Sequence, residues 1–179
     1  MILFDPWYRE LHPRLVAALT LVAADRDLAQ DAADEALVRA LERWSRVGQM
    51  DSPDGWTYRV AVNDLRRRAR RRLLERRVVS PVPLPPPATV AVEVWEAVRS
   101  LPRRQREAIG LRYLLDLPEA EVAAAMGVAV GTASATLAAA RARLAALLSD
   151  PGDAGDVVTG GATGAEPAIE IDEETRAWR

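Results

Sequence analysis

The chain has 179 residues, a formal net charge of −2 at pH 7 and 49% hydrophobic residues, enough to build a core in one domain or two small ones. It has no cysteine and one histidine, His12, which excludes a disulfide framework, a cysteine-based zinc site and a histidine-built catalytic triad. No apolar stretch approaches the roughly 18–20 residues that span a bilayer, so we expect a cytoplasmic protein without membrane insertion.

The positive charge is concentrated in one short stretch. Residues 59–77 carry nine arginines and two acids, whereas residues 1–58 sum to −4 and residues 150–179 to −6. Residues 78–92 carry no charge and contain five prolines. Because proline removes a backbone donor and fixes φ, we expect residues 78–92 to be an extended linker between two domains.

The first domain is expected at residues 1–77 as three helices. The first helix begins near Asp5 and Pro6, and its apolar positions are Trp7, Leu11, Leu15, Leu19 and Val22. The second is expected from Asp27 to Trp44, and the residues predicted near its buried face are Leu28, Ala33, Leu37, Leu41 and Trp44. After a loop at residues 48–55, a long third helix begins near Asp54 and continues into the arginines.

The second domain is expected at residues 93–149 as four helices that begin near Glu93, Pro102, Pro118 and Val130. Gly127 is suited to end the third helix. The apolar anchors predicted for the fourth are Leu137, Leu144, Leu147 and Leu148. A short helix, a glycine-centred turn and a longer helix form a helix-turn-helix pattern, which completes an all-α prediction of two small helical domains.

Residues 150–179 are rich in glycine and acids, and we expect them to form a disordered tail. Two roles are open for this tail. Its acidic stretch at residues 170–174 could occupy the arginine-rich helix as a mimic of phosphate, or the tail could be an unattached solubilising segment.

Short segments of the second domain carry a family resemblance. They are LPRRQREA at 101–108, LRY at 111–113, EVA at 121–123, MGV at 126–128 and GT at 131–132. Their order resembles the promoter-binding C-terminal domain of extracytoplasmic-function sigma factors of the RNA polymerase sigma-70 family. In the first domain, residues 29–40 resemble the family's polymerase-docking helix, and residues 56–63 with the following arginines resemble its promoter-opening helix.

The resemblance implies a sigma factor that binds core RNA polymerase and promoter DNA and directs promoter-specific initiation, with an anti-sigma factor as a further candidate partner. The DNA-binding positions that it implies are Trp56, Arg59, Asn63, Arg66, Arg67, Arg70, Arg71, Thr132, Ser134, Thr136 and Arg141. The polymerase-binding positions are Asp31, Asp34, Glu35 and Arg39. An arginine-dense helix beside a tryptophan and an asparagine also suits an opened strand on physical grounds, through phosphate contacts and base stacking.

The recognition helix leaves a second functional class open. Residues 133–140 carry no charge before Arg141, whereas the family commonly presents lysine or arginine there. A degenerate sigma-like regulator, which binds polymerase or a regulatory protein without specific promoter recognition, is therefore the alternative. We expect no enzymatic activity, no metal site and no cofactor, since no catalytic, metal-ligand or phosphate-loop constellation is present.

Overall fold

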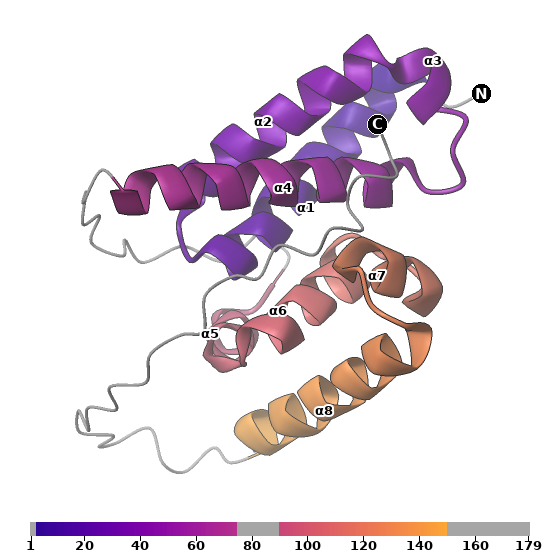
Figure 1. Cartoon of the computed structure of the whole chain (residues 1–179). Coiled ribbons are helices and arrows are strands. Elements are labelled where there is room, and N and C mark those ends of the chain that lie inside the picture. Colours follow the sequence, from indigo (N-terminus) through magenta and orange to yellow (C-terminus); the bar gives the residue numbers. More distant parts are fainter. Residues whose placement is uncertain (1–2, 75–89, 150–179) are drawn as a thin grey trace.

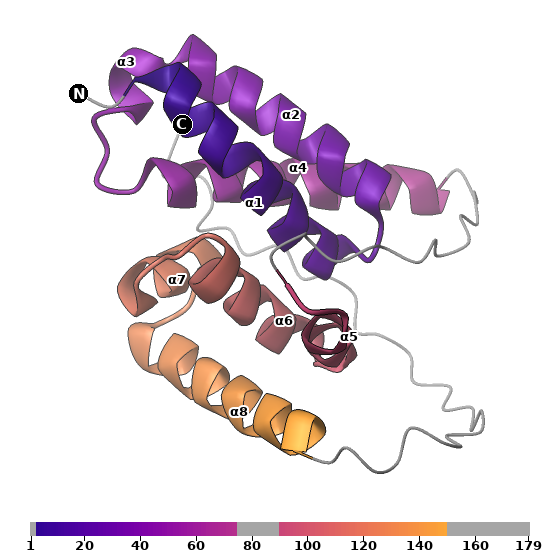
Figure 2. The same cartoon turned by 180° about the vertical axis from the view of Figure 1, so that it is seen from behind.

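The structure is a computed structural model that describes residues 3–74 and 90–149, and all regular secondary structure in these ranges is helical. The elements of the first unit are α1 (Phe4–Ala23), α2 (Arg26–Glu42), α3 (Trp44–Val47) and α4 (Pro53–Leu74). Those of the second unit are α5 (Val92–Ser100), α6 (Arg103–Ile109), η1 (Gly110–Leu114), α7 (Glu119–Met126) and α8 (Val130–Ser149). The two units form two layers (Figures 1 and 2). Most of the predicted linker and the whole predicted tail lie outside the described residues.

Close packing of α1, α2 and α4 builds the first unit. The five apolar positions predicted for the first helix are all buried in α1. The Asp25 side chain caps α2 by accepting a hydrogen bond from the Leu28 backbone N–H at 2.9 Å. Small buried side chains along α2 let its backbone approach both neighbours, and they are Ala29, Ala32, Ala33, Ala36 and Ala40.

Two details of the second predicted helix are wrong. The helix ends at Glu42, because Arg43 leaves helical geometry at φ −115°, and the short α3 follows. Trp44 begins α3 and packs on Phe4 and Trp7, with ring centroids 5.1 and 4.6 Å apart. Leu41 is 54% exposed. At about 100° per residue, the buried alanines set a face that Leu41 falls just outside.

The start of α4 is fixed by a proline and a cap. Pro53 is the first helical residue, and the Ser52 hydroxyl accepts a hydrogen bond from the Gly55 N–H at 3.2 Å. The Trp7 indole donates a hydrogen bond to Asp54 at 2.6 Å, which ties α1 to this helix start. Burial raises the pKa of the Asp54 carboxyl above its ordinary value, and the Trp7 hydrogen bond opposes that shift.

The second unit has the predicted helix-turn-helix. Gly127 ends α7 in the left-handed conformation at φ 68°, and α8 then begins at Val130. The second predicted helix is divided into α6 and the π-helical turn η1, which the sequence pattern did not indicate. The placing of Leu147 and Leu148 in the core is wrong, since both are exposed. The buried positions of α8 end at Ala140, and the rest of this long helix extends past its neighbours.

Within the described ranges, no single helix is long and apolar enough to cross a membrane. Only α7 and α8 taken together reach that length and composition, and they are bent by 104° relative to each other.

Candidate nucleic-acid interface

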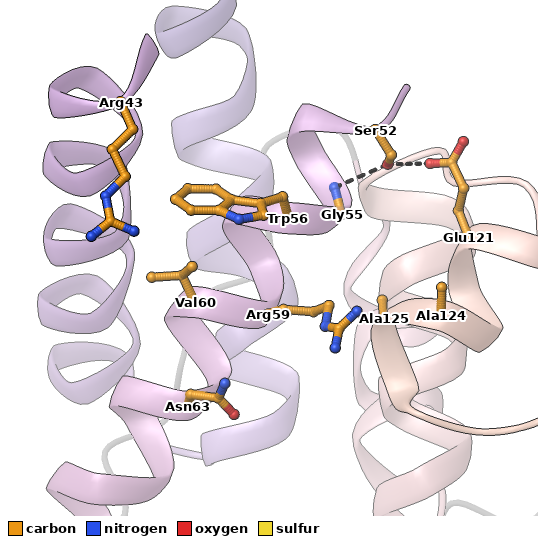
Figure 3. Close-up of a pocket in the computed structure, with 10 residues that line it drawn as sticks. All are labelled: Arg43, Ser52, Gly55, Trp56, Arg59, Val60, Asn63, Glu121, Ala124 and Ala125. Atoms are coloured by element: carbon orange, nitrogen blue, oxygen red, sulfur yellow. Dashed lines mark hydrogen bonds between the residues drawn. The ribbon is translucent and has the colours of Figure 1, made fainter. Parts of the chain in front are cut away.

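A hollow of about 300 Å³ opens on one face of α4. Trp56, Val60 and Asn63 follow one another at helical spacing, so α4 places them on the same face. Figure 3 shows Trp56 and Val60 turned toward Arg43 at the end of α2, while Arg59 extends toward α7. The hollow thus combines a half-buried indole, an exposed amide and guanidinium groups. Such a set can stack a planar base and contact its phosphate.

The second unit provides the far wall of this hollow. Glu121, Ala124 and Ala125 of α7 line it opposite α4 (Figure 3). The Ser52 hydroxyl donates a hydrogen bond to the Glu121 carboxylate, so the same serine both caps α4 and contacts α7. A carboxylate in this wall disfavours the entry of a phosphate into the hollow while α7 is in place.

The predicted arginines continue the same face of α4 beyond the hollow. Arg67, Arg70 and Arg71 are exposed, whereas Arg66 is half-buried and its buried Nε has no hydrogen-bond partner among the described residues. The helix therefore carries a band of positive charge that adjoins the tryptophan and asparagine, as the sequence predicted. Guanidinium groups in such a band suit a row of phosphates.

Asp64 is the residue of this helix that the sequence interpretation missed. Its carboxylate is only 3% exposed and accepts hydrogen bonds from Arg67 and Arg68. Burial raises the pKa of Asp64, but the hydrogen bonds from Arg68 and Arg67 outweigh it, so the pKa lies below its ordinary value. Arg68 also reaches Asp31 of α2 at 3.6 Å. An acid inside an arginine run was the available signal, because a buried carboxylate there needs such partners.

The four predicted polymerase-binding residues lie on the outward face of α2, and each forms an ion pair. Asp34 contacts His12 at 2.9 Å, Glu35 contacts Arg39 at 2.8 Å, and Asp31 contacts Arg68. Two exposed apolar residues on α2, Val38 and Leu41, complete this surface and were not predicted there. We call these six residues, Asp31, Asp34, Glu35, Val38, Arg39 and Leu41, the α2 face.

The polar residues of the predicted recognition helix bond within the protein. The Ser134 hydroxyl donates a hydrogen bond to Glu119 at 2.5 Å, and Arg141 contacts the other oxygen of Glu119 at 3.2 Å. Hydrogen bonds from Ser134 and Arg141 lower the pKa of Glu119. Arg141 also donates to the Tyr113 hydroxyl at 3.0 Å, and Thr136 bonds back to the Thr132 carbonyl at 2.8 Å.

The structure therefore brings Trp56, Arg59 and Asn63 together but places the recognition-helix residues elsewhere. α8 lies on the side of the second unit that faces away from the first unit (Figures 1 and 2). The candidate interface has two separate parts, one on α4 and one on α8.

Comparison with known families gives two matches in the same order as the two units. The family model described as sigma-70 region 2 matches residues 7–74, and the one described as sigma-70, region 4 matches residues 91–144. The RNA polymerase sigma-E factor of Streptomyces coelicolor is 27% identical over 147 residues, which cover 79% of this chain and 83% of that protein. The sigma-E factor of Streptomyces avermitilis is 29% identical over 150 residues, with 79% and 82% covered.

Solved structures share the fold. The sigma factor RpoE in complex with the anti-sigma factor NepR, from Bartonella quintana, matches with a TM-score of 0.68 at 23% identity, covering 83% of this chain and 98% of that one. CnrH in complex with the cytosolic domain of CnrY matches with a TM-score of 0.53 at 23% identity, covering 83% and 89%. The two family matches together cover most of the chain, in the order of the sequence motifs. The chain therefore belongs to the sigma-70 family as an extracytoplasmic-function sigma factor, a protein that binds core RNA polymerase and directs it to promoters.

Proposed function

We propose that the chain performs promoter opening through the α4 hollow, where an unstacked base of the promoter strand lies against Trp56. The observation that carries this proposal is the juxtaposition of Trp56, Arg59 and Asn63 in one hollow on an arginine-rich helix. Base stacking on an aromatic side chain contributes about 1–3 kcal/mol per base and tolerates any base. Asn63 adds an amide that can distinguish base edges.

Arg43 is an addition to the predicted set. It is exposed at the end of α2 and lines the hollow from the side opposite α7 (Figure 3). From this position its guanidinium can hold the phosphate of the nucleotide whose base lies on Trp56. Arg66, Arg67, Arg70 and Arg71 then continue the phosphate track along α4.

The remaining assignments divide the chain by function. Residues 1–77 form the domain that binds polymerase and opens the promoter, residues 78–92 link it to the second domain, and residues 93–149 form the helix-turn-helix domain. The α2 face meets the polymerase, where its acids suit a basic protein surface and its exposed Val38 and Leu41 add apolar contact. This work takes place in the cytoplasm, beside the polymerase, and requires no cofactor or catalytic step from the chain.

The second domain reads DNA through α8 with modest sequence discrimination. Thr132, Ser134, Thr136 and Arg141 are the polar groups available to it, and two of them bond to Glu119. A base contact contributes about 1–3 kcal/mol of discrimination only when the side chain reaches the base edge. The first domain therefore supplies most of the promoter selectivity in this proposal.

Chemical probing of unpaired thymines tests the role of the hollow. Complexes of core polymerase, this protein and promoter DNA are treated with permanganate, which oxidises thymines that are not stacked in a duplex. We expect reactivity with the parent chain and its loss with Trp56→Ala or Arg59→Ala. Arg46→Ala is the matched control, because Arg46 is an exposed arginine of the same unit that does not line the hollow. Equal reactivity in all variants would contradict the assignment.

A further inference from the structure

The two units share a continuous buried core. Gly110 of η1 lies against Ala18 and Leu21 of α1, where a Cβ at Gly110 would be 3.6 Å from the Ala18 Cβ. Arg14 of α1 donates a hydrogen bond to the Leu114 carbonyl at 2.6 Å. We call this packing of the second unit on α1 and α4 the closed arrangement (Figures 1 and 2).

A buried polar pair gives the closed arrangement a specific register. The Tyr58 hydroxyl of α4 donates a hydrogen bond to Glu107 of α6 at 3.3 Å, and both side chains are at most 2% exposed. Burial, followed by the charge and hydrogen bond of Glu107, raises the pKa of Tyr58, so the phenol keeps its proton and remains the donor. Because a buried acceptor without its donor is destabilised, this pair favours one placement of α6 on α4.

The closed arrangement covers the face of α4 that is assigned to the promoter strand. α7 supplies one wall of the hollow, and its Glu121 is held there by Ser52. Glu121 therefore faces the hollow from the side toward which Arg59 extends (Figure 3). On the same helix, the buried Nε of Arg66 lacks a hydrogen-bond partner among the described residues. A strand that followed α4 from Trp56 to the arginines would meet α7 and its carboxylate.

We propose that the second unit is an intramolecular cover of the strand-binding face of α4, and that the strand binds only after the two units separate. This proposal rests on the proposed function of that face. The closed state then reduces the apparent affinity for the strand by the fraction of molecules that are open. Any partner that holds the units apart increases strand binding without touching the strand.

A reversible disulfide between the units tests the cover. The 3.6 Å Cβ separation at Ala18 and Gly110 falls within the roughly 3.5–4.5 Å that disulfides require, and the chain has no cysteine of its own. The Ala18→Cys/Gly110→Cys variant is oxidised, and its affinity for a labelled single-stranded promoter oligonucleotide is measured by fluorescence anisotropy. Neither position lines the hollow. The two single-cysteine variants are the controls under the same oxidant.

We expect the disulfide to form readily and to weaken strand binding at least about tenfold, with full recovery after reduction and no change in the single-cysteine controls. Failure of the disulfide to form, or equal affinity of the oxidised and reduced forms, would overturn the cover while leaving the strand face intact. If the parent chain and the reduced variant both fail to bind the oligonucleotide, the strand face itself is wrong and the cover is overturned with it.

A second variant tests the same proposal in the opposite direction and needs no engineered bond. Tyr58→Phe keeps the ring but removes the hydrogen bond to Glu107, so it weakens the closed arrangement. Strand affinity should then rise roughly fivefold or more. Tyr113→Phe is the control, because it removes an exposed hydroxyl within the second unit. Unchanged or weaker binding by Tyr58→Phe would contradict the cover.

Discussion

Asp64 shows how a single acid organises the arginine-rich helix. Its buried carboxylate holds Arg67 and Arg68, and Arg68 in turn contacts Asp31 on the α2 face. The acid therefore links the strand-binding side of the first unit to its polymerase-binding side. A positive band with one buried counter-charge keeps two of its guanidinium groups in fixed positions while the others stay exposed.

The lowered pKa of Asp64 predicts a pH dependence of stability. Because the pKa is lower in the folded chain than in the unfolded chain, the stabilisation is fully present above about pH 4, the ordinary pKa range of aspartate. It is lost as the pH falls through the folded-state value. We expect Asp64→Asn to remove this component, so that its free energy of unfolding falls less than that of the parent chain below pH 4. Urea denaturation across that pH range measures the difference.

Asp54 contributes with the opposite sign and serves as the comparison. Its pKa is raised in the folded chain by burial, so its contribution to stability decreases as the pH rises from the unfolded-state pKa toward the folded-state one. Asp54→Asn should therefore show a steeper loss of stability toward acid pH than the parent chain. If both variants follow the parent curve, neither carboxylate is placed as described.

Glu119 restrains two of the few polar groups of the recognition helix. Replacing it with alanine should free Ser134 and Arg141 and remove a negative charge near the DNA, so that binding of duplex DNA becomes tighter. One added phosphate contact steepens the plot of log affinity against log salt by about 0.9. Glu96→Ala is the matched control, because Glu96 is an exposed acid on α5 that pairs with Arg99. Equal slopes for both variants would show that Arg141 does not reach a phosphate.

At the scale of the element, α4 combines a tryptophan-lined hollow with an arginine band. Replacing Arg70 and Arg71 by alanine should remove about two phosphate contacts and flatten the salt dependence of single-strand binding by roughly 0.7 log unit for each. Arg9→Ala/Arg46→Ala removes two exposed arginines of the same unit outside that band and should leave the slope unchanged. A slope that falls equally in both double variants would indicate only a general charge effect.

The α2 face makes a separate prediction. Reversing Asp31 and Glu35 to arginine should prevent pull-down of core polymerase while leaving the chain folded, because exposed substitutions usually change stability by less than about 0.5 kcal/mol. The same reversal at Glu93 and Glu96, two exposed acids of α5, should leave the pull-down intact. Circular dichroism confirms folding of both double variants. Retention of polymerase by the α2 variant would remove the assignment of this face.

Sequence periodicity was sufficient for α1, because its five predicted core residues recur every three or four positions and all are buried. It was insufficient for α2, because alanines define the buried face there and a longer apolar residue, Leu41, falls outside it. The π-helical turn was also not predictable, since it depends on how Gly110 packs against α1. Local patterns report a helix face only when the largest apolar residues are also the buried ones.

Motif order predicted the candidate site on α4, but not its surroundings. Trp56, Arg59 and Asn63 share a helix, so their spacing alone placed them together. Arg43 and Glu121 reach the same hollow from α2 and α7, and no local pattern relates residues so far apart in the chain. The bond between Glu119 and Ser134 likewise depends on the angle between α7 and α8. The sequence therefore indicated which helix carries the site but not what covers it.

At the scale of the whole molecule, the two units place their candidate DNA surfaces differently. The hollow of α4 faces the second unit, whereas α8 faces away from the first unit (Figures 1 and 2). In the closed arrangement only the recognition helix is presented to DNA. A protein that must engage a polymerase and an opened promoter together then gains from separating its units when the polymerase binds.

Transcription in vitro tests the central claim most directly. Purified core polymerase and this protein are combined with a library of promoter fragments, and the transcripts are sequenced. We predict transcripts that begin at a defined subset of the fragments, that require the protein, and that are lost with Trp56→Ala but not with Arg46→Ala. Stable binding to core polymerase without any protein-dependent transcript would contradict the claim, and would identify the chain as a regulator that occupies polymerase without directing initiation.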